Sequence, residues 1–237
     1  MVLDVLTAHD DLRQVKSRSL PARKEVTMPD EKPPDEKPIV FVVDDDISVR
    51  NSLALFIESA GWQPETFATG HEFLARQRAV GPSCLLLDVN LPDLSGLALQ
   101  RLIVDRAHTP IIFISGSGDV RTTADAMKAG ALEFLTKPLD DELLEAAMQE
   151  AINRSLVQLR QATTLGALRD CYAGLSPREK EVMSLVVAGR LNKQVGGELG
   201  ISEITVKAHR GKMMRKMRAQ TLPDLVRMAA KLQLTRF

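Results

Sequence analysis

Between Pro38 and about residue 155, short apolar runs alternate with longer segments in which apolar residues recur at helical spacing. The apolar runs predict strands at residues 38–44, 64–69, 84–88, 110–115 and 132–136. The amphipathic segments predict helices at residues 47–61, 70–78, 97–106, 120–129 and from 139 onward, the last one capped by Asp140 or Asp141. Strands that alternate with helices predict right-handed βαβ units and an open parallel sheet covered on both faces.

Two further stretches flank this α/β domain, which we expect at residues 38–155. Residues 1–37 end in a charged, proline-rich repeat that cannot bury enough apolar surface to order itself, so we expect a flexible tail. The last helix is expected to continue to about residue 170. Residues 156–173 would then form a semi-rigid helical linker, interrupted at Gly166.

After the linker, the sequence shows the signals of helix starts and ends but none of strands. Ser176 and Glu179 occupy capping-box positions around Pro177, and Gly189 is placed to end that helix. Three more helices are expected after it, with Ser202 capping the second of them; they lie near residues 192–199, 203–217 and 222–232. Residues 174–237 are therefore expected to form an all-α domain of four helices, a size that can fold alone.

Composition fits a globular protein with material for two cores, since the 237 residues are 44% hydrophobic and 26% charged. The apolar runs are too short to span a bilayer, and acids stand where a signal peptide would be apolar. We therefore expect a cytoplasmic protein with no membrane partner. Two cysteines, Cys84 and Cys171, give neither a disulfide framework nor a zinc-binding spacing.

The net charge of zero conceals an asymmetry between the two expected domains. Residues 39–150 hold 8 Lys and Arg against 17 Asp and Glu, whereas residues 174–237 hold 13 against 5. An acidic part joined to a basic part is typical of a protein that handles cations or phosphoryl groups in one half and meets a polyanion with the other.

The acidic part places carboxylates at strand ends. The strands that end in VFVVDDD and CLLLD should meet at one edge of the sheet, which brings Asp44, Asp45 and Asp88 together. Three carboxylates in one cleft repel one another unless a cation joins them, and partly hydrated oxygen ligands suit Mg²⁺. Ser115 and Lys137 reach the same edge from two other strands.

Each of these residues also has an ordinary interpretation. Asp44 to Asp46 could be a solvated turn, Ser115 a strand end and Lys137 a surface lysine before a proline. Their occurrence together on four strand ends favours phosphoryl transfer, which needs a carboxylate nucleophile and neutralisation of the phosphoryl oxygens.

The chain resembles the receiver domain of two-component response regulators, specifically the FixJ-like group, in the segments VVDDD, LLLDVNLPDLSG, FISGSGDV and AMKAGALEFLTKP. The resemblance covers residues 38 to about 155 and implies a flavodoxin-like (βα)5 fold. It implies phosphorylation on Asp88 by a sensor histidine kinase, and a cis peptide before Pro138. The implied Mg²⁺ ligands are Asp45, more indirectly Asp44, Asp88, and the backbone carbonyl of Asn90. It further implies that Ser115 is the switch hydroxyl, Lys137 the phosphate-binding lysine and Phe134 the aromatic switch residue. Phe134 could equally be a core aromatic only.

In the basic part, the segment TVKAHRGKMMRKM forms a two-sided helix at 3.6 residues per turn. Val206, Met213 and Met217 share one stripe, and Lys207, Gly211, Arg215 and Arg218 lie largely opposite, with Lys212 at one flank and Arg210 nearer the buried edge. A helix-turn-helix presents such a cationic face to the DNA major groove. A solvated basic helix is the alternative, which the caps, the turn and the preceding helix disfavour.

Residues 174–235 resemble the LuxR-type output domain, through LSPREKEVMSLVVAG, NKQV, LGISEITVKAHRGKMMRKM and LPDLVRMA. The resemblance makes residues 192–199 the scaffold helix and 203–217 the recognition helix. The DNA-contacting residues expected from the pattern and the resemblance are Asn192, Lys193, Thr205, Lys207, Ala208, Arg210, Gly211, Lys212 and Arg215. Gly196 and Gly197 replace the helix-forming pair expected there and could together cost about 2 kcal/mol, so a looser scaffold helix is expected.

Taken together, these features predict a two-domain response regulator, not an enzyme, that accepts a phosphoryl group on Asp88 and binds double-stranded promoter DNA. The family implies a homodimer on phosphorylation, formed through the fourth and fifth receiver helices. One alternative is a phosphorylation-independent DNA-binding protein whose receiver is a dimer scaffold. Another is an aspartate-nucleophile phosphohydrolase, although that fold generally has a second Asp where this chain has Asn90.

Overall fold

The structure is a computed structural model that describes residues 37–104, 106, 108–116 and 119–234. The predicted flexible tail, apart from Lys37, lies outside the described residues. The described residues form a sheet domain and a C-terminal helical domain. Helix α5 (Asp141–Ala173) begins in the first and ends at the second.

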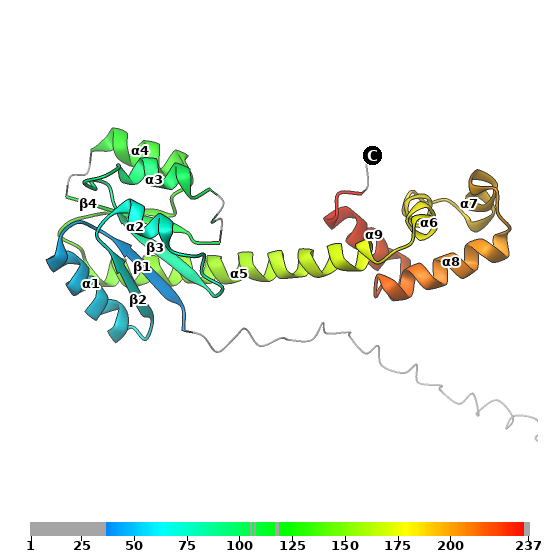
Figure 1. Cartoon of the computed structure of the whole chain (residues 1–237), viewed down its shortest axis with the longest axis horizontal. Helices are drawn as coiled ribbons and strands as arrows, with labels where there is room; N and C mark the ends of the chain where they lie inside the picture. The colour runs from blue at the N-terminus through cyan, green and yellow to red at the C-terminus, as the bar shows by residue number, and fades with distance from the viewer. Residues whose placement is uncertain (1–36, 105, 107, 117–118, 235–237) are drawn as a thin grey trace, which may run out of the picture. The chain divides into compact units, whose positions relative to one another are not determined.

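The first domain is built on a parallel five-stranded sheet (Figure 1). Its strands are β1 (Ile39–Val43), β2 (Gln63–Phe67), β3 (Ser83–Asp88), β4 (Ile111–Ser115) and β5 (Glu133–Thr136). They are ordered β2-β1-β3-β4-β5, and every neighbouring pair is parallel. This order is that of flavodoxin-like folds, which confirms the fold expected from the sequence.

Helices cover both faces of the sheet (Figure 1). On one face, α1 (Ile47–Ser59) and α5 pack against alternate residues of the central strands, including Val40, Leu86 and Ile112. On the other, the alternate residues, including Phe41 and Phe113, meet α2 (Gly70–Ala75), α3 (Gly96–Leu102) and α4 (Val120–Lys128). Burial on both faces explains why β3 is a continuous apolar run rather than an alternating one.

Helix α2 ends earlier than its pattern predicts, at Ala75 instead of residue 78. Arg76 adopts an extended backbone, and its guanidinium donates to the carboxylate of Glu65 on β2 at 2.8 and 2.7 Å. Its carbonyl accepts a hydrogen bond from Arg106. These tertiary contacts turn the chain out of the helix although the local sequence would continue it.

Helix α5 begins after Asp140, whose side chain accepts a hydrogen bond from the Leu143 N–H. It then runs for 33 residues without a break at Gly166, so the predicted interruption is wrong. A single glycine costs a helix only about 1 kcal/mol relative to alanine, and no proline follows to end it. The C-terminal turn instead finds apolar partners, because Cys171 and Tyr172 pack against the core of the second domain.

The second domain consists of α6 (Pro177–Val187), α7 (Asn192–Leu199), α8 (Glu203–Lys216) and α9 (Leu222–Lys231). The predicted capping box of Ser176 and Glu179 is present at the start of α6, and Ser202 caps α8. The core gathers apolar side chains of all four helices, among them Val182, Met183, Val195, Val206, Met213, Met217 and Leu225. In the part of the chain described here, none of the helices has the length and apolarity that crossing a membrane requires.

Helix α7 runs without a break from Asn192 to Leu199 across its two adjacent glycines, and the looser helix expected there stays a prediction. Gly196 is buried and accepts a hydrogen bond from the Ile201 N–H at 3.0 Å. A Cβ at Gly196 would lie 2.7 Å from the Ile201 carbonyl oxygen, whereas one at Gly197 would meet nothing within 4 Å. Gly196 therefore permits the close approach of α7 to the turn before α8.

Candidate functional site

Two carboxylates stand side by side where the order of the strands reverses. Strands β1 and β3 pair with Val43 opposite Leu87, so the next residues lie side by side, Asp44 just after β1 and Asp88 as the last residue of β3. Asp44 is 1% exposed and Asp88 is 5% exposed. Buried charges need partners, so this pair requires a cation or several hydrogen-bond donors.

Lys137 supplies that cation. It follows β5, and its backbone N–H donates to the Ser115 carbonyl at 2.8 Å. Its ammonium donates to Asp44 Oδ2 at 2.8 Å and to Asp88 Oδ1 at 3.0 Å. Burial works against the charged ammonium, but the hydrogen bonds to these carboxylates raise the pKa of Lys137. The peptide bond between Lys137 and Pro138 is cis, as expected.

Asp88 is further fixed by the loop that follows β3. Its Oδ2 accepts a hydrogen bond from the Asn90 N–H at 2.6 Å. Burial raises the pKa of Asp88, while the bonds from Lys137 and Asn90 oppose that rise. The Asp88 carboxylate is therefore held in one orientation at the end of β3 by donors to both of its oxygens.

The third predicted carboxylate, Asp45, is exposed and does not share the ammonium with the other two. Among the described residues, no three His, Cys, Asp or Glu side chains converge closely enough to hold a metal ion by themselves. In this structure the Lys137 ammonium is the cation that joins Asp44 and Asp88.

Ser115 and Phe134 lie on the two strands next to this edge. Ser115 ends β4 and is 1% exposed. Phe134, on β5, is half-buried and stacks on Phe113 with ring centroids 6.1 Å apart. The structure thus places Phe134 against the core on the face that carries α3 and α4.

Two residues that hold this site were missed in the sequence. Arg50 on α1 donates to the carbonyls of Asp44 at 2.7 Å and Asp45 at 2.9 Å, which ties the acidic loop to the helix. Gly96 donates to the Val89 carbonyl at 2.9 Å, and a Cβ there would lie 2.3 Å from the Asp88 carbonyl oxygen. The glycine in LPDLSG was a visible signal, whereas nothing local marked Arg50.

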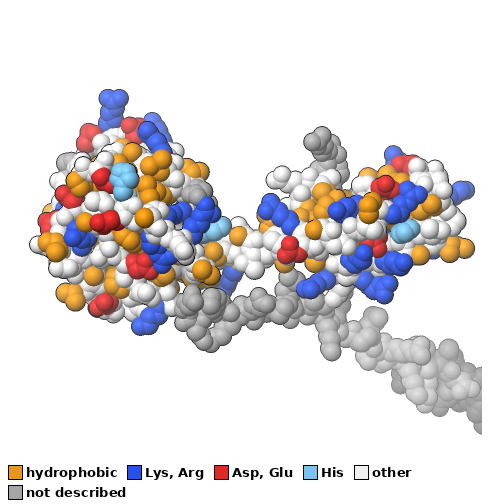
Figure 2. Space-filling view, viewed as in Figure 1, with side chains coloured by type: hydrophobic (Ala, Val, Ile, Leu, Met, Phe, Trp, Pro, Cys, Tyr) orange, Lys and Arg blue, Asp and Glu red, His pale blue; other side chains and the backbone are white. Residues whose placement is uncertain are grey.

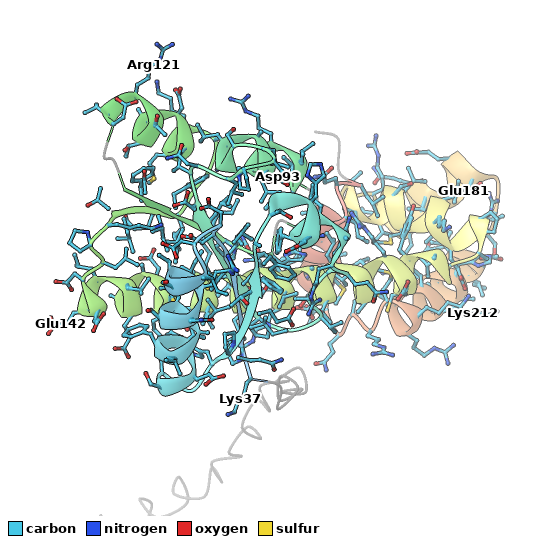
Figure 3. The ribbon with its side chains drawn as sticks, turned by 60° about the vertical axis from the view of Figure 1, so that its left-hand side comes forward. Lys37, Asp93, Arg121, Glu142, Glu181 and Lys212 are labelled. Carbon is cyan, nitrogen blue, oxygen red and sulfur yellow. The ribbon has the colours of Figure 1, made fainter. Side chains whose placement is uncertain are left out.

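The loop after β3 is also tied to α2. The carboxylate of Asp93 accepts from the backbone N–H groups of Gly70 at 3.2 Å and His71 at 2.9 Å. The His71 ring Nδ1 lies 2.5 Å from the same carboxylate. Although desolvation raises it, these bonds together lower the pKa of Asp93 to about 2. Asp93, labelled in Figure 3, is thus an ionised acceptor that joins the loop after β3 to the start of α2.

The second candidate site is the outer surface of α8. Val206, Met213 and Met217 are buried as predicted, and Lys207, Gly211, Lys212, Arg215 and Arg218 are exposed. Figure 2 shows Lys and Arg side chains gathered over this part of the domain, and Figure 3 labels Lys212 on it. Ala208 is exposed as well, whereas Arg210 is half-buried.

The residues expected to contact DNA from the scaffold helix lie beside α8. Asn192 begins α7, and its side-chain oxygen accepts from Arg210 at 3.1 Å, which links the two helices. Lys193 is exposed, and Thr205 is half-buried with its N–H bonded to the Ser202 hydroxyl at 3.1 Å. Of the residues expected to contact DNA, Lys193 is therefore exposed on α7, whereas Asn192 and Arg210 are hydrogen-bonded to each other.

Known protein families match both parts of the chain in which these sites lie. Residues 40–149 match the family of response regulator receiver domains, and residues 173–229 match the luxR family of bacterial regulatory proteins. Nodulation protein W of Bradyrhizobium diazoefficiens is 47% identical over 194 residues, which are 81% of this chain and 86% of that protein. The transcriptional regulatory protein FixJ of Azorhizobium caulinodans is 41% identical over 191 residues, 80% of this chain and 90% of that protein.

Two solved structures of response regulators have a fold similar to that of this chain. The response regulator StyR is 40% identical and superposes with a TM-score of 0.74, covering 82% of this chain and 99% of that one. Full-length FixJ from B. japonicum is 34% identical, with a TM-score of 0.50, and covers 85% of this chain and 100% of that one.

The chain belongs to the response regulator family, with a receiver domain followed by a LuxR-type DNA-binding domain. More narrowly, it is a two-component transcription regulator and not an enzyme, which excludes the phosphohydrolase alternative. Membership of this family implies a histidine kinase and DNA as partners. Receiver domains generally bind Mg²⁺ for phosphorylation.

Proposed function

We propose that Asp88 accepts the phosphoryl group and that this event controls DNA binding by the C-terminal domain. The observation that carries the proposal is the Lys137 ammonium bonded to both Asp44 and Asp88 at the switch point of the sheet. An Asp88 oxygen would attack the phosphorus of a kinase phosphohistidine. The P–N bond would break with its electron pair going to the ring nitrogen, and with one proton supplied by solvent the products are an aspartyl phosphate and a neutral histidine.

The residues around Asp88 fit Mg²⁺ by their donor chemistry. Carboxylate and carbonyl oxygens are the ligands that this ion prefers, and it commonly keeps several waters in place of protein ligands. Asp45, Asp88 and the Asn90 carbonyl would bind it directly and Asp44 more indirectly. When bound, the ion supplies positive charge to the oxygens of the transferring phosphoryl group.

The new charge would act through neighbouring residues. A phosphorylated aspartate carries about −2 charge, which Lys137 would partly neutralise. The Ser115 hydroxyl would donate to a phosphoryl oxygen, and Phe134 would then turn further into the core beside Phe113. Its half-buried position on β5 supports this role, because part of its side chain is still open to solvent.

The outer surface of α8 would enter the DNA major groove. Exposed Lys207, Lys212 and Arg215 can reach phosphates or base edges, and Ala208 and Gly211 let the helix approach closely. At the side, Lys193 and Thr205 would contact the backbone phosphates. Asn192 and Arg210 would position α7 against α8 through their mutual hydrogen bond and contact the backbone.

We further propose the domain boundaries expected from the sequence, with a receiver at 38–155, a linker at 156–173 and an output domain at 174–237. Phosphorylation would favour a homodimer through the α4 and α5 surface of the receiver, so that two copies of α8 read two-fold-related half-sites. The protein would work in the cytoplasm, where promoter DNA is accessible.

The test is phosphorylation by a small-molecule donor. Wild type and Asp88→Asn are incubated with acetyl phosphate and Mg²⁺, and intact mass is measured. The proposal predicts that wild type gains one phosphoryl group and that Asp88→Asn gains none. Equal incorporation by both proteins would show that another residue is the acceptor.

A further inference from the structure

One line of residues on α8 points directly away from the core of the output domain. Ile204, Ala208, Gly211 and Arg215 follow one another at spacings of four, three and four residues, which keeps them on one side of a helix. All four are exposed, and the buried stripe of Val206, Met213 and Met217 lies on the opposite side. This outward line is the part of α8 that would enter a groove most deeply.

Ile204 is unusual within the outward line. Its side chain is 81% exposed, although it is large, branched and apolar. It stands in the first turn of α8, next to Glu203, and makes no contribution to the apolar core cluster of the domain. Exposing so much of an apolar side chain to water is unfavourable for the free protein, and the free-energy cost is proportional to the exposed apolar area. A partner that covers Ile204 would recover that free energy.

The surroundings of Ile204 indicate which partner covers it. Lys207, Lys212 and Arg215 are exposed on the same helix, Arg218 is exposed just after its end, and Lys193 is exposed on the neighbouring helix. A cationic surface of this kind complements a polyanion and disfavours an apolar groove on another protein. The next two members of the outward line, Ala208 and Gly211, carry almost no side chain, and a Cβ at Gly211 would meet nothing within 4 Å.

We propose that Ile204 selects thymine in the DNA half-site by covering the thymine 5-methyl group in the major groove. Residues near the N-terminus of a recognition helix contact base edges, and the thymine methyl is the apolar feature of those edges. The short side chains of Ala208 and Gly211 allow the helix to come close enough for this contact. The proposal rests on the proposed assignment of α8 as the DNA-reading helix.

The experiment first needs a binding sequence, because the target sites are not defined by the structure. The full-length chain, treated with acetyl phosphate and Mg²⁺, is used to select bound duplexes from a random-sequence DNA pool. Each thymine of the selected half-site is then replaced singly by deoxyuridine, which removes only the 5-methyl group. Dissociation constants are measured for wild type, Ile204→Ala and Lys212→Ala.

The expected result is one thymine position at which deoxyuridine weakens wild-type binding by about fourfold, the effect of exposing one methyl group. Ile204→Ala should bind the thymine and deoxyuridine duplexes equally well. Lys212→Ala is the matched control on the same helix. It should bind both duplexes more weakly while keeping the ratio between them, because a phosphate contact does not sense the methyl group.

Three results would overturn the inference. If a sequence is selected but no deoxyuridine replacement weakens wild type, Ile204 does not read a methyl group, and the DNA-binding assignment of α8 stands. If the methyl dependence persists in Ile204→Ala, another residue reads it. If the pool yields no enriched sequence, the proposed DNA-reading surface fails together with this inference.

Discussion

Gly96 lies so close to Asp88 that a Cβ on the glycine would stand 2.3 Å from the aspartate carbonyl oxygen. The same Cβ would also be 3.0 Å from a ring atom of Phe113. Backbone and a buried ring cannot both move aside without shifting the end of β3. The start of α3 and the proposed phosphoacceptor are therefore packed backbone to backbone, which leaves no room for any other residue at position 96.

We predict that Gly96→Ala lowers the stability of the receiver by about 1 to 3 kcal/mol through overpacking and slows phosphorylation of Asp88. Thermal unfolding and the rate of phosphoryl gain from acetyl phosphate measure the two effects. Gly166→Ala is the control, because a Cβ at position 166 meets nothing within 4 Å on helix α5. Wild-type behaviour of Gly96→Ala would show that the strand end adapts freely.

Removing the Lys137 ammonium would leave Asp44 and Asp88 without the cation they share. We predict that Lys137→Met lowers receiver stability by about 2 kcal/mol, less than for a fully buried pair because the lysine is 27% exposed. Added Mg²⁺ should raise the melting temperature of the variant more than that of wild type. Lys128→Met, which changes an exposed lysine of α4, is the control. An equal response to Mg²⁺ in all three proteins would argue against a cation site at these carboxylates.

The output domain contains an ion pair whose strength depends on pH. Lys216 Nζ donates to Glu179 Oε2 at 2.7 Å, and this bond, with that from the Ser176 N–H, lowers the pKa of Glu179 below its ordinary value of 4.5. A carboxyl whose pKa is lower in the folded state adds stability above its unfolded pKa and loses that stability as pH falls through the folded one.

We therefore predict that the stability of the output domain falls below about pH 4.5, and that Lys216→Met removes part of this dependence. At neutral pH, Lys216→Met should lower stability by about 1 kcal/mol, the scale of one charge-assisted hydrogen bond with a half-exposed partner. Urea unfolding between about pH 3 and pH 7, roughly the range in which carboxylates titrate, measures both effects. Parallel pH curves for wild type and Lys216→Met would contradict the prediction.

The two glycines of α7 should respond differently to the same substitution. We predict that Gly197→Ala stabilises the output domain by up to about 1 kcal/mol, because its Cβ meets open space and alanine favours the helix. Gly196→Ala should gain less or lose stability, because its Cβ would press on the Ile201 carbonyl. Urea unfolding of the two variants compares them directly. Equal gains would show that the turn before α8 can move aside at little cost.

The features that the sequence predicted correctly depend on local pattern or on strand ends. Continuous apolar runs marked β1, β3 and β4, and parallel pairing then required Asp44, Asp88 and Lys137 to meet at one edge. Capping residues such as Ser176 and Ser202 marked helix starts, because their side chains bond the first turns wherever the helix lies.

What the sequence did not predict depends on contacts between one element and another element or loop of the fold. The early end of α2 follows from the ion pair of Arg76 with Glu65, which lies on another element. The role of Gly196 follows from the approach of Ile201, and that of Arg50 from two carbonyls in the loop before its helix. Gly196 and Arg50 meet backbone atoms that any sequence would provide, so no partner residue type reveals their roles.

The most direct test of the central claim is DNA affinity measured with and without phosphorylation. Wild type and Asp88→Asn are treated with acetyl phosphate and Mg²⁺, and binding to one selected DNA duplex is measured for both. The account predicts that treatment tightens binding by wild type and leaves Asp88→Asn unchanged. If phosphorylated wild type binds with the same affinity as the untreated protein, the receiver is a scaffold for dimers and not a phosphorylation switch.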